Sequence, residues 1–492
     1  MYAQAARGRV SGFVQPILFV NGIFLVVLAL GMCVPAVVDF ATDRRELWVF
    51  PAAAGVTMFV GCGLALTNAS SHPSLSSRQI FIITTSVWVI VPAFGAIPFM
   101  LSELHMSFTD AFFESMSGVT TTGSTVITGL DRLPAGLLIW RGILQWLGGL
   151  GIMVMSFSIM PLLCVGGMQI FKIEAFEPGD KTAPRAAQIS VLLTLVYVAL
   201  TLACAVALLL CGLTGVEAAT HAMTTIATGG YSTSDASIGH FNSATVEIVV
   251  TVGMILGGTP FMLILTAVRG RPGELFGNTQ FRCYLAILAL ATLAVAGWLV
   301  LHGHPDPAEA FRIAAFNVTS IMTGTGFAAE DYMTWGAFPI ALLFFLTFVG
   351  GCSGSTSCGI KVFRFQIVAA VVGREFTRIF SPNGVMIPRY GGIAISQEAV
   401  TSVMNFMAAF VFGFAALTLA LGLLGLDFVT AASSAATAIS NVGPGLGPIV
   451  GPAGNFQSLP DAAKWLLCAG MVVGRLEVMT VLVLFSRHFW RD

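Results

Sequence analysis

Charged residues are scarce in this sequence, and their scarcity sets the class of the protein. Asp, Glu, Lys and Arg make up 10% of the 492 residues, against roughly a quarter in an ordinary soluble domain. Hydrophobic residues account for 56%, and long apolar runs recur along the whole chain. The sequence therefore predicts a polytopic membrane protein. The first apolar run, 13–38, is too long for a cleavable signal peptide, so we expect a retained transmembrane helix.

Patterns typical of catalytic and metal sites are also missing. The 7 histidines never pair at ligand spacing within a predicted span, and the 9 cysteines, Cys164 among them, show no metal-ligand spacing. No Walker A sequence occurs, and no strand is followed by a GxGxxG turn. We therefore expect no enzymatic activity, no covalent or nucleotide cofactor in this chain, and no nucleic-acid partner. The cysteines are interpreted as small buried hydrophobic residues.

One polar run, MSGVTTTGSTVITG (116–129), stands out against this apolar background. It is too polar to face lipid and too rich in Gly and β-branched residues for a stable helix. An apolar span and a short amphipathic stretch from Phe108 precede it, and a second apolar span follows. The same unit returns with the runs TTIATGGYST from Thr224, TSIMTGTGFA from Thr319 and TAISNVGPGLG from Thr437.

An approximate fourfold internal repeat follows from aligning these runs on one glycine each. The reference glycines are Gly123, Gly229, Gly324 and Gly443. A second glycine follows each of them at a similar interval: Gly148, Gly257, Gly350 and Gly470. The sequence therefore predicts four related units in one chain.

The predicted fold is an all-α polytopic membrane protein. Two leading transmembrane helices (1–77) precede four units of span, pore helix, filter loop and span around a central pore, which gives ten spans. The expected unit boundaries are 78–170, 171–272, 273–390 with an interrupted second helix, and 391–492. Most of the 23 Lys and Arg residues, Lys172 and Lys181 included, then lie on one side of the membrane. The positive-inside rule makes that side, with both termini, cytosolic.

The four polar runs must be sheltered from lipid, because irregular backbone survives at membrane depth only inside protein or beside a water-filled cavity. Converging on one axis, their carbonyl groups can replace the hydration shell of a cation. Four acids precede the runs, where they can cap the pore helices or line an outer mouth: Asp110, Glu217, Glu309 and Asp427. The alternative is a set of small-residue helix-packing motifs, which four runs in register disfavour.

A second irregular stretch, GGCSGSTSCGIKV (350–362), interrupts the apolar span 337–371 and is too long for a simple kink. Beyond it, Arg475 lies inside the final predicted span. An intramembrane arginine is a functional-site candidate, and the alternative is a structural ion pair with Glu477 or another acid. Lys361 is either a pore charge or a lysine that snorkels to the interface.

These stretches resemble the Trk/Ktr/HKT superfamily of potassium transporters, most closely the bacterial Trk-type membrane subunit. SMSGVTTTGSTVITGLDRLP, QWLGGLGIMV, GGCSGSTSCGIKVFR and GRLEVMTVLVLF carry the resemblance, which covers nearly the whole chain. It implies potassium uptake across the bacterial inner membrane through a gated, selective pore. In that superfamily a serine at the first filter glycine is associated with sodium preference, so four glycines favour potassium.

The resemblance also implies roles for particular residues. Backbone coordination of K⁺ is carried over to Thr121, Thr122, Gly123, Ala227, Thr228, Gly229, Met322, Thr323, Gly324, Asn441, Val442 and Gly443. A gate beneath the filter is carried over to Gly350, Gly351, Cys352, Ser353, Gly354, Ser355, Thr356, Ser357, Cys358 and Gly359, with Lys361 and Arg475. Asn441 and Val442 depart from the Thr pattern, which indicates an asymmetric filter, and Cys358 stands where we expect Gly.

Partners and the coupling mode depend on the same resemblance. It implies a homodimer in membrane lipid and a separate cytosolic regulatory subunit that binds nicotinamide or adenine nucleotides. Parallel repeats and scarce midplane acids favour a channel-like pore over alternating access. Obligate coupling to H⁺ or Na⁺ stays open as the alternative.

Overall fold

The computed structural model describes residues 2–42, 46–69, 75–158, 182–381 and 387–490. The predicted boundary at 170/171, Cys164, Lys172 and Lys181 lie outside the described residues. Within the described part the chain is helical except for its loops and one small hairpin, β1 (Arg389–Tyr390) and β2 (Ile393–Ala394). The predicted all-α class is confirmed.

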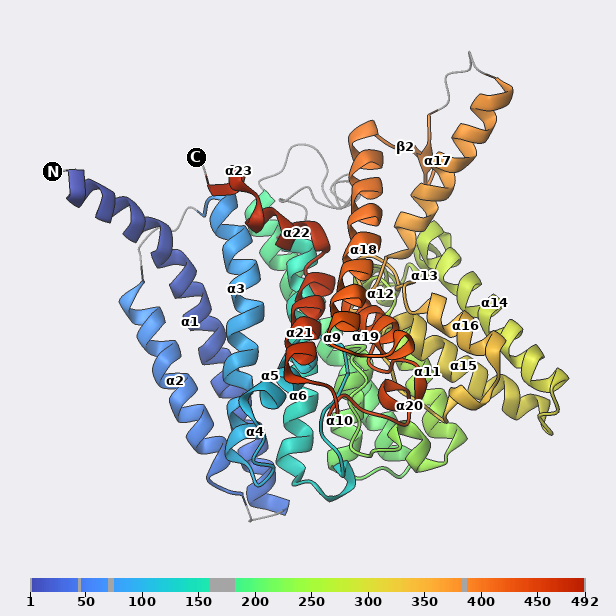
Figure 1. Ribbon diagram of the computed structural model, residues 1–492, viewed down its shortest axis with the longest axis horizontal. Helices are drawn as coiled ribbons and strands as arrows, with labels where there is room; N and C mark the ends of the chain where they lie inside the picture. Colours follow the sequence, from blue (N-terminus) through green and yellow to red (C-terminus); the bar gives the residue numbers. More distant parts are fainter. Residues whose placement is uncertain (1, 43–45, 70–74, 159–181, 382–386, 491–492) are drawn as a thin grey trace.

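The helices follow the predicted order along the chain (Figure 1). The leading part and the first unit contain α1 (Tyr2–Thr42), α2 (Val49–Thr67), α3 (Ser77–Gly95), α4 (Ile97–Leu101), α5 (Phe108–Val119), η1 (Leu130–Arg132) and α6 (Ala135–Ser158). The second unit contains α9 (Thr182–Leu210), α10 (Gly215–Ile226), η2 (Ser237–Phe241), α11 (Ala244–Gly257), α12 (Phe261–Val268) and α13 (Pro272–Gly277). The third contains α14 (Thr279–Leu301), α15 (Pro307–Thr323), η3 (Tyr332–Thr334), α16 (Ala337–Leu346) and α17 (Val362–Phe380). The fourth contains α18 (Gln397–Leu423), α19 (Phe428–Ser440), α20 (Gly447–Val450), α21 (Asp461–Arg475), α22 (Val478–Leu482), η4 (Val483–Phe485) and α23 (Arg487–Trp490).

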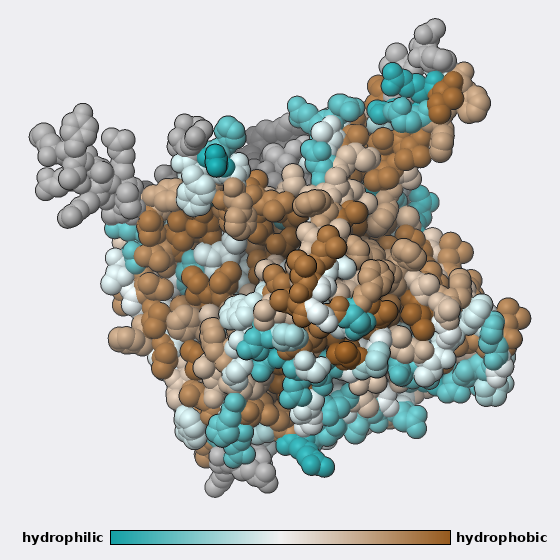
Figure 2. All heavy atoms as spheres, in the orientation of Figure 1, coloured by the Kyte–Doolittle hydropathy of each residue, from teal (hydrophilic) through white to brown (hydrophobic). Residues whose placement is uncertain are grey.

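Among the described residues, 7 helices are long and apolar enough to cross a membrane. Two bent pairs, α11 with α12 (104°) and α21 with the helical turns after it (112°), raise the number to 9. The tenth predicted span is represented by α16, which is too short to cross a bilayer and stops at Leu346. Figure 2 shows the hydrophobic band across the middle of the molecule, with hydrophilic residues along its lower edge. The chain is a multi-pass membrane protein.

Four short helices, one in each unit, precede the polar runs: α5, α10, α15 and α19. Each begins at a side-chain cap, and two of the four predicted acids, Glu217 and Asp427, take part in these caps. Thr214 and Glu217 form a capping box at α10, and Asp427 accepts from the Thr430 amide at the start of α19. Asp306 caps α15, and the Ser107 hydroxyl accepts from the Asp110 amide at α5. These caps fix where each pore helix begins.

The two leading helices pack closely because glycines lie at their crossing. A Cβ on Gly22 would lie 2.6 Å from the backbone nitrogen of Ala65 and 2.8 Å from the Gly61 carbonyl oxygen. Small residues at such a crossing let helix backbones approach within membranes. The α1–α2 pair lies against α3 on one flank of the bundle (Figure 1).

Candidate functional site

The four polar runs form a closed ring of backbone in the centre of the molecule. Each run leaves its pore helix through one residue in the left-handed region: Thr121 (φ 52°), Thr228 (φ 51°), Gly324 (φ 79°) and Asn441 (φ 52°). Two residues later come the ring glycines, Gly123, Gly230, Gly326 and Gly443. A Cβ on each would strike the next loop: the Gly229 carbonyl, the Thr325 carbonyl, the Gly443 nitrogen (2.8 Å) and the Gly123 carbonyl oxygen (3.0 Å), in that order.

This ring corrects the sequence alignment in two of the four units. Gly229 and Gly324, chosen as reference glycines, lie one and two residues before the ring positions Gly230 and Gly326. Ala227 is the C-terminal cap of α10, while Met322 and Thr323 are the last residues of α15. The predicted equivalence of these triplets with 121–123 is therefore wrong.

Hydrogen bonds around the left-handed residue support the same register. Thr120 and Thr122 join their hydroxyl groups at 2.8 Å across Thr121, and Thr323 and Thr325 do so at 2.7 Å across Gly324. The alignment failed because TGGY and TGTG each hold two glycines, while threonine itself takes the left-handed turn in the first two units. Glycine identity alone therefore could not mark equivalent backbone positions.

An outer cavity of about 300 Å³ opens above the ring, and all four ring glycines line it. Asp235 on its wall accepts from the backbone amides of Gly129 (2.8 Å) and Leu130 (3.2 Å), which joins the first and second units. A hydrogen bond from the Ser234 side chain lowers the pKa of nearby Asp131 below its ordinary value. The cavity therefore has a polar wall with acidic side chains at its margin, an arrangement that attracts cations.

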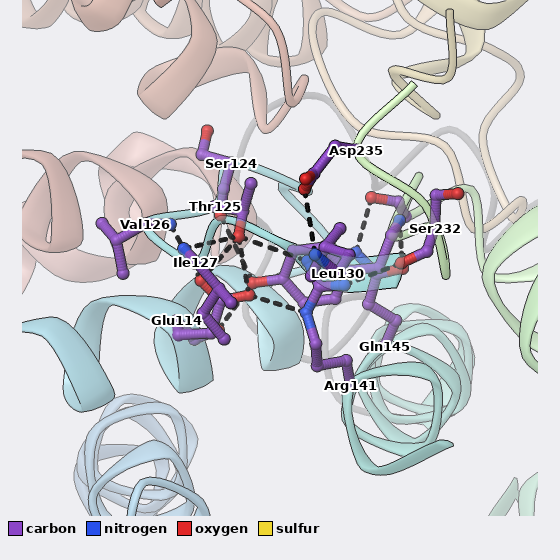
Figure 3. A network of polar contacts seen from close by, with 12 residues as sticks. Glu114, Ser124, Thr125, Val126, Ile127, Leu130, Arg141, Gln145, Ser232 and Asp235 are labelled. Atoms are coloured by element: carbon purple, nitrogen blue, oxygen red, sulfur yellow. Dashed lines mark hydrogen bonds and ion pairs between the residues drawn. The ribbon is translucent and has the colours of Figure 1, made fainter. Parts of the chain in front are cut away.

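A buried ion pair braces the first loop from behind (Figure 3). Arg141 of α6 donates from Nε to Glu114 of α5 at 2.8 Å, and both side chains are at most 2% exposed. The second Glu114 oxygen accepts from the Val126 amide at 3.0 Å, and the Thr125 hydroxyl donates to the same carboxylate. Arg141 also donates to the Ser232 carbonyl at 2.7 Å. One pair thus ties the pore helix to the loops of two units.

Gln145, one turn along α6 from Arg141, extends this brace to the ring. Its side-chain amide donates to the Gly229 carbonyl at 2.6 Å and accepts from the Tyr231 amide at 3.0 Å. The Tyr231 hydroxyl donates to the Glu114 carbonyl at 2.7 Å, and the Arg141 guanidinium lies over the Tyr231 ring. Sequence reasoning missed Glu114, Arg141 and Gln145. Two features of the sequence could have indicated this site: an acid inside a pore helix, Glu114, and an arginine inside a membrane span, Arg141.

The irregular stretch between α16 and α17 lies directly beneath the ring. Its Cys358 sulfur is 3.6 Å from the Thr121 hydroxyl, and its Thr356 hydroxyl is 3.3 Å from that of Thr228. A Cβ on Gly324 would lie 3.5 Å from the Cys358 nitrogen. The predicted position under the polar runs therefore agrees with the structure, and the break, 347–361, is longer than predicted.

Hydrogen bonds hold this loop against the second unit. The Thr356 hydroxyl lies 2.9 Å from the Ile226 carbonyl and 3.0 Å from that of Gly257, and the Cys352 amide donates to the Gly258 carbonyl. Between Cys352 and Thr356, the Gly354 carbonyl accepts from the Phe261 amide. The Ser353 backbone amide donates to the Gln280 side chain of α14 at 2.7 Å. Cys352, Ser353, Ser355, Thr356, Ser357 and Cys358 are all buried. In this conformation the loop obstructs the axis below the ring.

Thr356→Val is expected to loosen the loop, because valine keeps the shape and removes the hydroxyl that reaches Ile226 and Gly257. A buried hydrogen bond of this kind stabilises by about 1 kcal/mol, so the backbone amides of the loop should exchange their hydrogens with solvent about fivefold faster. Ser355→Ala is the matched control, since the Ser355 hydroxyl bonds to Cys352 within the same loop. Equal exchange rates in the two variants would contradict this role of Thr356.

Arg475 ends α21 and reaches the same loop from the fourth unit. Its guanidinium donates to the Thr356 carbonyl at 3.2 Å and contacts the Cys358 sulfur. Glu477 binds Arg364 of α17 instead, at 2.6 Å. The alternative of an Arg475–Glu477 ion pair is therefore wrong, and no other ion pair to Arg475 occurs among the described residues.

Comparison with known proteins gives a consistent result. The family model TrkH, described as a cation transport protein, matches residues 49–491. The Trk system potassium uptake protein TrkI of Halomonas elongata is 41% identical over 478 residues, covering 97% of each chain. The Trk system potassium uptake protein TrkH of Escherichia coli (strain K12) is 37% identical over 478 residues, covering 96% of this chain and 98% of its own.

A solved structure matches as well. The crystal structure of the potassium transporter TrkH from Vibrio parahaemolyticus superposes with a TM-score of 0.90 at 35% identity, over 97% of this chain and 99% of that chain. The relatives are named for transport rather than for an enzymatic reaction. The ring of four polar runs and the loop beneath it thus lie in a chain that belongs to the TrkH family of cation transport proteins.

Proposed function

We propose that this protein carries potassium ions across the bacterial inner membrane through one gated pore per chain. The observation that carries the proposal is the closed ring of four glycines, one from each unit, with an outer cavity above it and a buried loop below. Stacked carbonyl oxygens of this kind replace the water around a dehydrated cation. The relatives named above are potassium uptake proteins, which supports K⁺ as the ion.

The filter in this proposal consists of four backbone triplets in the corrected register. They are Thr121–Gly123, Thr228–Gly230, Gly324–Gly326 and Asn441–Gly443. The fourth differs in chemistry: the Asn441 amide donates to the Thr122 hydroxyl and to the Met471 carbonyl, both at 2.9 Å. That amide locks the fourth loop to the first and makes the filter asymmetric.

The gate in this proposal is the loop 350–359 together with Lys361 and Arg475. The described contacts correspond to a closed state, because the loop lies against Thr121 and Thr228. A guanidinium below the filter also repels cations that arrive there. For the gate to open, the loop must move, and Thr356 and Cys358 must then break their present contacts with the polar runs and the second unit.

Channel-like permeation is favoured over obligate H⁺ or Na⁺ symport. Coupled transport needs carboxylates that change partner or protonation near the ion path. Glu114, the buried acid next to the filter, is engaged by Arg141, Thr125 and Val126. The face on which both chain termini lie (Figure 1) would then be cytosolic. There a nucleotide-binding regulatory subunit would dock on a homodimer embedded in membrane lipid.

Two alanine substitutions test the corrected register. Gly326→Ala places a Cβ 2.7 Å from the Pro444 ring and 2.8 Å from the Gly443 nitrogen, so it should distort the ring and lower the K⁺/Na⁺ permeability ratio about tenfold. Gly324→Ala is the matched control, because it shares the positive φ but its Cβ would meet no atom closer than 3.4 Å. We expect it to keep most of the selectivity.

The measurement is ion flux into liposomes that contain the purified chain, under a K⁺ gradient and then a Na⁺ gradient. A larger loss of selectivity in Gly324→Ala than in Gly326→Ala would restore the register based on glycine identity. Flux that appears only with an imposed proton or sodium gradient would contradict channel-like permeation and would support coupled symport. Absence of any K⁺ flux would overturn the proposed function itself.

A further inference from the structure

A second, smaller cavity lies on the other side of the gate loop from the ring. Its volume is about 40 Å³, and we call it the gate cavity. Its walls are loop residues 353–359, two phenylalanines of α18, and four charged side chains: Lys361, Arg364, Arg475 and Glu477. Three of these four side chains are positive, although the proposed path carries cations.

The charges around the gate cavity do not balance. Glu477 is the one carboxylate on its wall, and it binds Arg364 at 2.6 Å. Arg364 also lies over the Phe406 ring, 3.7 Å from its centre. Among the described ion pairs, none includes Lys361 or Arg475. The cavity therefore holds two more positive than negative side chains.

Donor groups on the wall are also left without acceptors. Arg475 is 4% exposed, and its Nε has no hydrogen-bond partner among the described residues. The Lys361 ammonium carries three protons, and its recorded contact is one carbonyl, that of Ser357. Buried cations without a counter-charge are strongly unfavourable, and folded proteins supply such groups with an opposite charge. The wall thus presents donor groups and positive charge toward a small, partly open cavity.

We propose that the gate cavity binds one small monovalent anion of the chloride class between Arg475 and Lys361. A cavity needs about 10–15 Å³ of space open to the centre of a water molecule for each water that it holds. Its volume of about 40 Å³ therefore suits a monatomic ion with one or two waters. Phosphate groups and larger carboxylates are too large for this volume.

The bound anion would join two elements that must separate when the gate opens. Lys361 immediately precedes α17 at the end of the loop, whereas Arg475 ends α21. An ion that binds only while they are close stabilises the closed conformation by mass action. The site itself rests on the charges around the cavity, and its effect on the gate rests on the proposed function.

Ionisation of the Cys358 thiol is the competing source of negative charge, because its sulfur contacts Arg475. A thiolate there would neutralise one of the two excess positive charges of the gate cavity. It would also accept a hydrogen bond from the Arg475 nitrogen that contacts the loop. The Cys358→Ser variant separates the two ideas. If an anion supplies the charge, serine leaves anion binding within about twofold of its original strength, and if a thiolate does, serine strengthens anion binding about tenfold.

The experiment uses the full chain with bromide as the probe. Anomalous diffraction from crystals grown in bromide locates the ion, and bromide titration of thermal unfolding at constant ionic strength, with gluconate as the replacement, measures its affinity. We expect one peak between Arg475 and Lys361, and a loss of affinity of about tenfold in Lys361→Gln. Arg374→Gln is the matched control, because Arg374 lies on α17 but binds Glu375 at 2.7 Å, away from the cavity.

Three results would overturn the proposal: no bromide peak in the gate cavity, unchanged affinity in Lys361→Gln, or stronger binding in Cys358→Ser. If Lys361→Gln fails to fold, Arg475→Gln provides the same comparison. Bromide binding does not depend on transport, so a protein that binds bromide but conducts no K⁺ would refute the proposed function and leave the anion site standing.

Discussion

Glu114→Gln is expected to lower the free energy of unfolding by about 3–5 kcal/mol and to reduce ion selectivity at the same time. The substitution leaves Arg141 charged and 1% exposed, and removes its one carboxylate partner among the described residues. It also weakens the bonds by which the carboxylate holds Thr125 and the Val126 amide behind the first filter loop. Thermal unfolding in detergent and K⁺/Na⁺ permeability ratios in liposomes measure the two effects.

A second buried pair provides the control for this prediction. Glu247 of α11 binds Arg312 of α15 at 2.6 Å, with side chains 8% and 25% exposed, and the other described ion pair of Arg312 is with Glu309 of the same helix. Glu247→Gln should lower stability by a smaller amount, since Arg312 keeps Glu309 at 2.9 Å, and should leave selectivity unchanged. The double variant Glu114→Gln with Arg141→Met removes both charges and should recover stability but not selectivity. Unchanged selectivity in Glu114→Gln would refute the idea that this pair positions the loop.

Arg475→Gln is expected to raise K⁺ flux by more than tenfold. Its guanidinium contacts Cys358, whose sulfur is 3.6 Å from the Thr121 hydroxyl, so the charge lies close to the lower end of the filter. At roughly 6 Å and an effective dielectric constant of about 20, one positive charge raises the energy of a K⁺ ion by about 3 kcal/mol. Glutamine removes that charge and the hydrogen bond to the Thr356 carbonyl.

Flux from liposomes under a K⁺ gradient tests this prediction, with two comparisons. Arg374→Gln, which removes a charge from the surface of α17, should leave flux unchanged. Arg475→Lys keeps the charge but loses the planar fork of donors, so it should conduct at an intermediate level. Equal flux from Arg475→Lys and Arg475→Gln would assign the whole effect to hydrogen bonding and none to charge.

Hydropathy and repetition were sufficient to predict the class of fold, because they depend on composition and on spacing along the chain. Apolar runs of bilayer length must be spans, and four Gly/Thr runs cannot face lipid. The capped starts of the pore helices were also readable, since Asp427 and the Thr214–Glu217 box are local features of the sequence. The family resemblance agrees with the matched family and its relatives.

The filter register could not be read from the sequence, because it depends on backbone angles rather than on residue types. Thr121, Thr228 and Asn441 take the same left-handed turn that Gly324 takes in the third unit, so glycine does not mark that position. Only the packing of each ring glycine against the next loop shows that Gly230 and Gly326 are the equivalent positions. Contacts between different units carry this information, and no single run contains it.

Sequence alone thus determined that the chain spans the membrane repeatedly, folds as four related units, and interrupts one span near 350–362. The tertiary structure decided which glycines pack against the next loop, that Glu477 binds Arg364 rather than Arg475, and that Glu114 and Arg141 meet behind the first polar run. The physical reason is distance along the chain. Local sequence determines helices and caps, whereas ion pairs between residues 27 or 113 positions apart form only when the fold brings their elements together.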